Sequence, residues 1–403
     1  MSSFALDGLT PGTIARPVDA AEAGRILAEA HAAGRAVVPW GGGSHQAGGN
    51  PLARYDLALD LRGLAGVVDH QPADLTLTVR AGTPLAVVQA ALAAHGQLLP
   101  LEAEDPATAT IGGLVSAGVS GPSRLAYGTA RDFTIWTAAL QADGTAVHGG
   151  AKVVKNVAGY DMTKLYMGSL GSAGVLTELC FKLRPLPATR PVVIAGFEEP
   201  GAAADALAEL ATGRLVPSLV TIVHGPDAWG EPYNLAKWLL VIGADGPRET
   251  TSWQVERFFG LASAQAALIT SLDGEEALAV RQALMTPRSQ GEVRLDLRVL
   301  PGQTALLLEA LAFMPEGPPT GVFAEATLGV VRCTWATASD AWRAAATFAD
   351  DLGGRWTLAA APLALRREVD VFGPARPDRA LMRRLKATLD PKGILAPGRF
   401  AGG

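Results

Sequence analysis

Glycine and other small residues gather in three stretches of the first half of the chain. The first stretch follows the apolar run 36–39, which predicts a short buried strand. Because glycine has no Cβ, such a loop can turn several backbone N–H groups toward one point. A concave row of N–H groups binds anions, so a phosphate or pyrophosphate would suit it. The residues of this stretch are Gly41, Gly42, Gly43, Ser44, His45 and Gln46.

Two later stretches repeat this composition. The second holds Ile111, Gly112, Gly113, Ser116, Ala117 and Gly118, and is followed by Tyr127, Gly128 and Asp132. The third runs from Val154 to Glu178 and includes Gly174 and Val175. Neither a P-loop nor a GxGxxG fingerprint occurs in the chain. A tight turn, or a helix packed closely through small residues, is the alternative interpretation of any one stretch, whereas the three together are explained if all wrap one long ligand.

Hydrophobic patterning predicts the elements that position these loops. Asp19, with Glu22 three positions on, predicts the start of a helix that Gly34 ends. Residues 75–80 alternate apolar and polar side chains, which is typical of an antiparallel strand. Further strands are predicted at 36–40, 57–61, 175–183, 192–197, 219–224, 238–243, 293–300, 321–326, 328–335 and 355–359, with helices at 85–95, 200–210, from 251, 303–313, 339–351 and 378–389.

The second half of this pattern favours an α+β fold. Helices that alternate with antiparallel strands predict two ferredoxin-like halves sharing one sheet. We expect a first domain at 1–187, a second at 188–375, and a C-terminal segment at 376–403 that returns to the first domain.

Composition excludes several classes of function. The net charge is −5 and the sequence has no basic run, so the clustered positive charge that nucleic-acid-binding proteins need is absent from it. No apolar run reaches the roughly 18 residues of a membrane span, and the first residues lack a signal-peptide pattern. We therefore expect a cytoplasmic protein, peripheral at the inner membrane face only through partners. Cys180 and Cys333 lie in strand-like runs and are interpreted as reduced core residues. Without CxxC or paired-histidine spacing, no metal or iron–sulfur site is expected in this chain.

Taken together, the motifs resemble the FAD-binding domain of the vanillyl-alcohol oxidase/p-cresol methylhydroxylase (PCMH) flavoprotein superfamily. The matching pieces are GGGS from Gly41, TIGG-x₃-AG-x₂-G from Thr110, and KN-x-AGYD from Lys155. The tail 389–400 is similar to the superfamily's LDP-x-G ending. Within it, the stretch 153–161, the run GPSR and the short length resemble the E subunits of bacterial glycolate oxidases. The resemblance implies a two-part PCMH-type FAD-binding domain with a ferredoxin-like α+β cap domain.

The resemblance also implies roles for the small residues. Residues 41–45, with Gln46, would wrap the FAD pyrophosphate through backbone N–H groups. Ile111, Gly112, Gly113, Ser116, Ala117 and Gly118 would line the flavin side, and Tyr127, Gly128 and Asp132 would hold the loop beside it. Gly174 and Val175 would meet the adenine end. The implied FAD is non-covalent. A covalent flavin link at His45, as some superfamily members have on a histidine of this loop, is the alternative.

The implied function is that of an FAD-binding subunit of a glycolate oxidase complex, which oxidises glycolate to glyoxylate by hydride transfer to the flavin. A sister FAD subunit and an iron–sulfur subunit are the implied partners. Catalytic relatives carry an HxGDGN-type motif in the cap, whereas the last histidine here is His224, so the catalytic residues are unknown. Candidate cations for a substrate carboxylate are Arg294, Arg298, Arg332, Arg355 and Arg366, with ordinary surface ion pairs as the alternative.

Two other functions remain open at this stage. The chain could be a self-sufficient FAD-dependent oxidoreductase for another 2-hydroxy acid or an alcohol. It could also be a non-catalytic scaffold of the same fold, although the three intact glycine stretches speak against loss of the cofactor.

Overall fold

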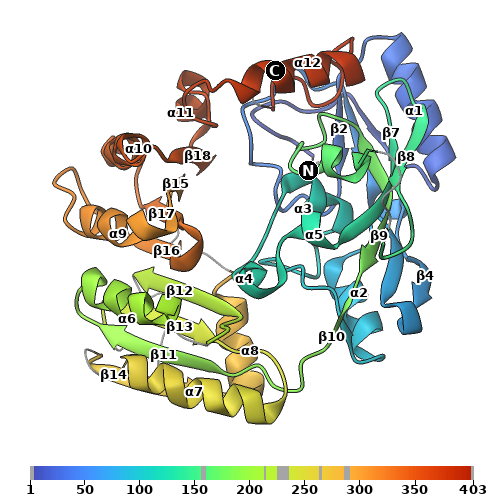
Figure 1. Ribbon diagram of the computed structural model, residues 1–403. Coiled ribbons are helices and arrows are strands. Elements are labelled where there is room, and N and C mark those ends of the chain that lie inside the picture. The colour runs from blue at the N-terminus through green and yellow to red at the C-terminus, as the bar shows by residue number, and fades with distance from the viewer. Residues whose placement is uncertain are drawn as a thin grey trace.

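The structure is a computed structural model that describes residues 4–155, 160–212, 215–224, 236–262, 266–285 and 291–400. Figure 1 shows an N-terminal domain on one side and a cap domain on the other, with α4 (Arg124–Tyr127) at the boundary between them. The described part of the third glycine stretch excludes residues 156–159, so most of the KN-x-AGYD motif lies outside the described residues.

The N-terminal domain contains two sheets. The smaller is parallel, in the order β1-β3-β2, and its strands are Thr13–Ala15, Leu57–Asp60 and Val37–Trp40. The larger is antiparallel, in the order β4-β5-β9-β7-β8, and its strands are Val67–Gln71, Thr76–Arg80, Val175–Lys182, Thr134–Leu140 and Ala146–Gly150. The two-part organisation expected of a PCMH-type domain is therefore present.

Helices and short elements cover these sheets. Helix α1 begins with the predicted capping box, because Asp19 Oδ1 accepts from Glu22 N–H at 2.7 Å while Glu22 Oε2 accepts from Val18 N–H at 2.8 Å. Leu27 of α1 packs with Val37 and the small sheet, and α2 and α3 pack on the larger sheet. The bounds are α1 Ala20–Ala32, η1 Leu61–Gly63, η2 Pro72–Asp74, α2 Leu85–Ala93, β6 Gln97–Leu98, α3 Ile111–Ala117, α5 Ala130–Phe133, η3 Met162–Tyr166 and β10 Arg184–Pro185.

The described cap domain is built on one eight-stranded antiparallel sheet, in the order β14-β11-β13-β12-β16-β17-β15-β18. Each half follows the order strand-helix-strand-strand-helix-strand, and β12 pairs with β16 to join the halves. The predicted ferredoxin-like halves are confirmed by this topology. The strands are β11 Val192–Phe197, β12 Leu219–His224, β13 Trp238–Gly243, β14 Leu268–Leu272, β15 Val293–Arg298, β16 Gly321–Glu325, β17 Val330–Trp335 and β18 Arg355–Ala360.

Helices cover the cap sheet unevenly. Helices α6, α7, α9 and α10 bury one face in the largest hydrophobic core of the described residues, while α8 covers the other face of the first half. On β15 the residues Val293, Leu295 and Leu297 point into that core, so Arg294 and Arg298 lie on the opposite face. The bounds are α6 Pro200–Thr212, α7 Arg248–Ala262, α8 Gly274–Ala283, η5 Pro301–Gln303, α9 Thr304–Ala312, η6 Ala326–Leu328, α10 Ala341–Asp351 and α11 Leu363–Glu368. The sequence patterns missed β14, α8 and α11 in this domain, and β1, β7 and β8 in the N-terminal domain.

The last segment packs on the N-terminal domain. Helix α12 (Asp378–Leu389) lies at the same end of the molecule as α1 in Figure 1. Beyond it, the Val37 N–H donates to Ile394 O at 2.8 Å, and the Ala396 N–H donates to Val37 O at 2.9 Å. The tail therefore runs beside β2, the strand that leads into the first glycine stretch.

Both cysteines are buried free thiols, as predicted, and burial raises the pKa of each. Within the described residues, no helix combines the length and the apolar character that a membrane crossing requires. The same residues contain no group of histidine, cysteine or acidic side chains placed to hold a metal ion.

Candidate cofactor site

The three glycine stretches line one pocket of the N-terminal domain. From the first come Gly41, Gly42, Gly43, Ser44, His45 and Gln46; from the second Gly112, Gly113, Ser116 and Ala117; from the third Gly174 and Val175. Residues more than a hundred positions apart in the sequence thus face a common space, as expected if they wrap a single long ligand.

The first stretch, which we call the first arc (residues 41–46), presents backbone donors to the pocket. Among the described residues, the N–H groups of Gly42, Gly43, Ser44 and His45 make no backbone hydrogen bond. The arc closes where the Gln46 N–H donates to Gly43 O at 3.2 Å. Unused donors on a concave loop fit an anionic group, so the arc has the chemistry that a pyrophosphate needs.

The second stretch contributes space rather than donors. It forms α3, whose cap Thr110 accepts from the Gly113 N–H at 3.3 Å, while the Gly112 N–H donates to Ala81 O at 2.7 Å. These first-turn amides are therefore already satisfied inside the protein. A Cβ on Gly112 would lie 2.7 Å from Ala81 Cβ, so glycine here allows α3 to approach the strand behind it.

The first arc needs its glycines in order to lie against the second stretch. A Cβ on Gly41 would lie 2.1 Å from Thr110 Oγ1, and one on Gly42 would lie 1.7 Å from the carbonyl oxygen of Thr108. In the third stretch, a Cβ on Gly174 would lie 2.8 Å from the Tyr166 ring. The missing side chains thus let backbone segments meet closely around the pocket.

Two further predicted residues lie outside the pocket, next to α3. Ile111 is fully buried in the core beneath the larger sheet. Gly118 ends α3 in the left-handed conformation, with φ +67°, and its Cβ position lies 3.3 Å from Gly168. Both residues shape α3 without facing the pocket.

The residues predicted to hold the adjacent loop also lie outside the pocket. Asp132 caps the short helix α5, where its Oδ2 accepts from the Thr129 N–H at 2.8 Å. A Cβ on Gly128 would lie 2.6 Å from that carboxylate, which explains why glycine stands there. The Tyr127 hydroxyl reaches across to the cap domain and donates to Asp245 Oδ2 at 2.7 Å.

Sequence reasoning missed several residues of the pocket wall. Three of them directly neighbour a predicted residue, namely Trp40, Thr110 and Leu176. Arg399 comes from the far end of the chain, and no local pattern signals it. The missed residues are Pro39, Trp40, Leu61, Ala81, Thr110, Leu170, Gly171, Leu176 and Arg399.

His45 is held in its neutral form. Burial lowers the pKa of its imidazole, and the positive charge of Arg294 on the cap strand β15 lowers it further. Ser44 Oγ lies 2.9 Å from His45 Nδ1. Arg294 lies on the face of β15 that points away from the cap core.

The other candidate arginines have different partners. Arg332 lies 3.4 Å from Glu325, which also pairs with Arg124 of α4 at 2.8 Å. Arg366 pairs with Asp7 at 2.8 Å. Arg355 lies on the surface, 3.7 Å from Asp378. Within the described part of the chain, no ion pair occupies Arg294 or Arg298, so these two remain available to an anion between the domains.

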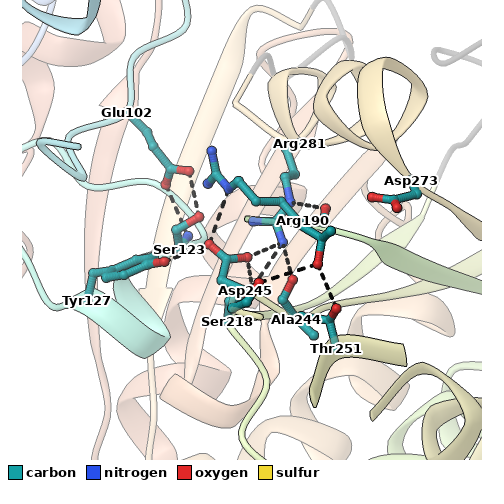
Figure 2. A network of polar contacts seen from close by, with 12 residues as sticks. Glu102, Ser123, Tyr127, Arg190, Ser218, Ala244, Asp245, Thr251, Asp273 and Arg281 are labelled. Atoms are coloured by element: carbon teal, nitrogen blue, oxygen red, sulfur yellow. Dashed lines mark hydrogen bonds and ion pairs between the residues drawn. The ribbon is translucent and has the colours of Figure 1, made fainter. Parts of the chain in front are cut away.

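A second polar network, shown in Figure 2, joins the two domains around Asp245. Besides Tyr127, its carboxylate accepts from Ser218 Oγ at 2.7 Å, from Arg281 Nη2 at 2.5 Å and from Arg190 Nε at 3.2 Å. Burial alone would raise the pKa of Asp245, but the charges of Arg281 and Arg190 together with the hydrogen bonds from Ser218 and Tyr127 outweigh burial and lower that pKa. The network is a charged contact between domains, away from the pocket.

Comparison with known families agrees with this geometry. The family described as "FAD binding domain" matches residues 11–150, which include the first two glycine stretches. The family described as "FAD linked oxidases, C-terminal domain" matches residues 375–400, the segment that ends at the pocket.

Several curated proteins are similar to this chain. The glycolate oxidase subunit GlcD of Bacillus subtilis (strain 168) is 29% identical over 283 residues, which cover 68% of this chain and 60% of that protein. The glycolate oxidase subunit GlcE of Escherichia coli (strain K12) is 39% identical over 160 residues, covering 40% and 45%. A D-2-hydroxyglutarate dehydrogenase of Xanthomonas citri pv. viticola is 31% identical over 184 residues, covering 46% and 39%. The chain thus spans about half the length of these relatives.

Among solved structures, an alkyldihydroxyacetonephosphate synthase superposes with a TM-score of 0.71 over 97% of this chain and 77% of its own. At 18% identity this likeness shows the fold alone. The matched families and the names of the relatives agree on FAD-linked oxidoreductases, in line with the sequence expectation.

Proposed function

Since the chain contains a PCMH-type FAD-binding domain and the C-terminal segment of FAD-linked oxidases, we propose that it binds FAD in the glycine-lined pocket and serves in the oxidation of a small 2-hydroxy acid. The observation that carries this proposal is the meeting of three separate glycine stretches at one pocket, with unused backbone donors in the first arc.

Each stretch has a role in this proposal. The N–H groups of residues 42–45 donate to the pyrophosphate, α3 lies along the flavin, and Gly174 with Val175 borders the adenine end. Charge-assisted hydrogen bonds of this kind each contribute about 1.5–3 kcal/mol, so a neutral backbone cradle is adequate for a dianion. The FAD is held without a covalent link, and neutral His45 contacts it.

The oxidation removes two electrons and two protons from the carbon and hydroxyl of the 2-hydroxy acid, giving a 2-oxo acid. Bound FAD supplies the two-electron acceptor. The substrate carboxylate needs a cation, and we assign this role to Arg294, which lies on the face of β15 opposite the cap core and forms no ion pair among the described residues. None of the chain's histidines lies beyond His224, so no residue is assigned as the base.

The relatives named as glycolate oxidase subunits favour glycolate as substrate, glyoxylate as product, and a complex with a sister FAD subunit and an iron–sulfur subunit. In such a complex the chain is cytoplasmic and meets the inner membrane face only through its partners. The similarity to D-2-hydroxyglutarate dehydrogenase favours a second candidate, a self-sufficient dehydrogenase for a larger 2-hydroxy acid.

The test is flavin content followed by anaerobic reduction. Purified protein should be yellow and should release all of its flavin on denaturation, whereas flavin retained on the peptide that contains His45 would overturn the non-covalent assignment.

Glycolate, D-lactate and D-2-hydroxyglutarate are then added to the chain alone and to the chain co-expressed with its two proposed partner subunits. Bleaching of the chain alone supports the self-sufficient dehydrogenase, and glycolate oxidation only in the complex supports the subunit. A colourless protein that takes up no FAD would contradict both and favour a scaffold.

A further inference from the structure

A buried cation in the pocket wall has no partner for most of its donors. Arg399 is only 2% exposed, and its Nε–H donates to Gly48 O at 3.0 Å. Both of its terminal nitrogens, Nη1 and Nη2, are buried without any hydrogen-bond partner. The residue lines the pocket together with the first arc.

The neighbouring charges do not neutralise Arg399. The nearby carboxylate of Asp7 is already paired with Arg366 at 2.8 Å, so the three side chains together carry a net positive charge. Burial lowers the pKa of Arg399 to about 10, which still leaves the guanidinium protonated at neutral pH. An uncompensated buried charge is strongly destabilising, so an anion bound at this guanidinium would stabilise the folded chain.

The backbone fixes the position of this guanidinium. The carbonyl of Arg399 accepts from the Asn50 N–H at 3.0 Å, which ties the tail to the chain just after the first arc. A Cβ on Gly49 would lie 2.9 Å from Arg399 Cγ, so glycine leaves room for the stem of the side chain. The pairing of the tail with β2 thus positions Arg399, which lines the same pocket as the first arc.

We propose that Arg399 is the cationic ligand of the FAD pyrophosphate, donating from Nη1 and Nη2 to the phosphate oxygens that the N–H groups of the first arc also bind. This inference rests on the proposed binding of FAD. Among the anionic groups of FAD, the pyrophosphate is the one charged in both redox states. The guanidinium of Arg399 offers a planar pair of donors, which suits phosphate better than a lysine ammonium does.

The test uses the full-length protein with Arg399→Gln, Arg399→Lys and the matched control Arg384→Gln, whose side chain is exposed on α12. We expect R399Q to weaken FAD binding about 10- to 100-fold, R399K to recover part of the affinity, and R384Q to bind FAD like the unaltered protein. Titration of the apoprotein with FAD measures all three dissociation constants. Equal FAD affinity in R399Q and the unaltered protein would overturn the inference and leave the proposed function standing.

Two further measurements separate the role proposed here from others. ADP carries the pyrophosphate without the flavin, so R399Q should weaken ADP competition by a factor similar to that for FAD, and the midpoint potential of bound flavin should not change. Unaltered ADP competition with a lowered potential would place Arg399 at the flavin ring and contradict the proposal.

The apoprotein of R399Q should melt at or above the temperature of the unaltered apoprotein, because the unpaired charge is gone. A lower melting temperature for the R399Q apoprotein would show that the Arg399 side chain has a structural role, and this result would also overturn the proposal. If the unaltered protein binds no FAD, the proposed function fails together with this inference.

Discussion

At the scale of single residues, the absence of side chains decides where the cofactor site can form. Gly42 is the tightest case, because its Cβ position lies 1.7 Å from the carbonyl oxygen of Thr108 and 2.6 Å from its carbonyl carbon. Both atoms belong to the backbone, which cannot move aside as the end of a flexible side chain can. The first arc and the segment before α3 therefore depend on each other for their positions.

We expect Gly42→Ala to lower the free energy of unfolding by about 1–3 kcal/mol, since an added methyl group must displace backbone. Bound FAD should fall with it, because the donors of the first arc move. Chemical denaturation and the ratio of flavin to protein after purification measure the two effects. Gly302→Ala is the control, since a Cβ there meets no atom within 4 Å and its φ is not left-handed. Similar losses in G42A and G302A would contradict the steric explanation.

At the scale of elements, α3 is short and depends on its cap. Seven residues form the helix, and the Thr110 hydroxyl accepts from the Gly113 N–H at 3.3 Å. Thr110 is buried and also lines the pocket, against the Cβ position of Gly41. Thr110 thus both caps α3 and forms part of the pocket wall.

Thr110→Val keeps the shape of the side chain and removes the acceptor, so the Gly113 N–H is left without its partner. We expect this change to lower the free energy of unfolding by about 0.5–2 kcal/mol, as for other lost helix caps. Thr110→Ser keeps the hydroxyl and should retain the cap. Any decrease in the free energy of unfolding of T110S then reflects the missing methyl group alone. Urea denaturation compares the two variants, and a larger loss for T110S than for T110V would argue against a capping role.

At the scale of the whole molecule, charged networks hold the cap domain against the N-terminal domain. The Asp245 carboxylate accepts a hydrogen bond from the Tyr127 hydroxyl of the N-terminal domain (Figure 2). Within the cap domain it contacts the side chains of Ser218, Arg190 and Arg281. A separate set joins Arg124 of α4 to Glu325 of the cap. These contacts fix the face of the cap that carries Arg294 relative to the pocket.

We expect Tyr127→Phe to lower the free energy of unfolding by about 1 kcal/mol, because one hydrogen bond to a buried carboxylate is lost while the other partners remain. Flavin content should stay the same, since Tyr127 lies outside the pocket lining. Tyr160→Phe provides the control, because its side chain is 93% exposed. Denaturant titrations of both variants test the difference, and equal stability of Y127F and Y160F would show that the bridging hydrogen bond contributes nothing.

Local patterns in the sequence determined most of the secondary structure and the three glycine stretches. The helix Asp378–Leu389 and the strands Val192–Phe197 and Trp238–Gly243 have the predicted bounds, because periodicity and caps are properties of neighbouring residues. The missed β14, at Leu268–Leu272, lies at the edge of the cap sheet with most of its side chains at least partly exposed, so its apolar signal is weak.

Only the tertiary structure decided which distant residues share the pocket. It brings Arg399 beside the first arc through the pairing of the tail with β2, and it directs Tyr127 to Asp245 instead of the cofactor site. Backbone preferences act over a few residues, so they can form a strand or a glycine loop without knowledge of the rest of the chain. Which loop meets which tail depends on how all the buried faces pack at once, and no stretch of sequence contains that information alone.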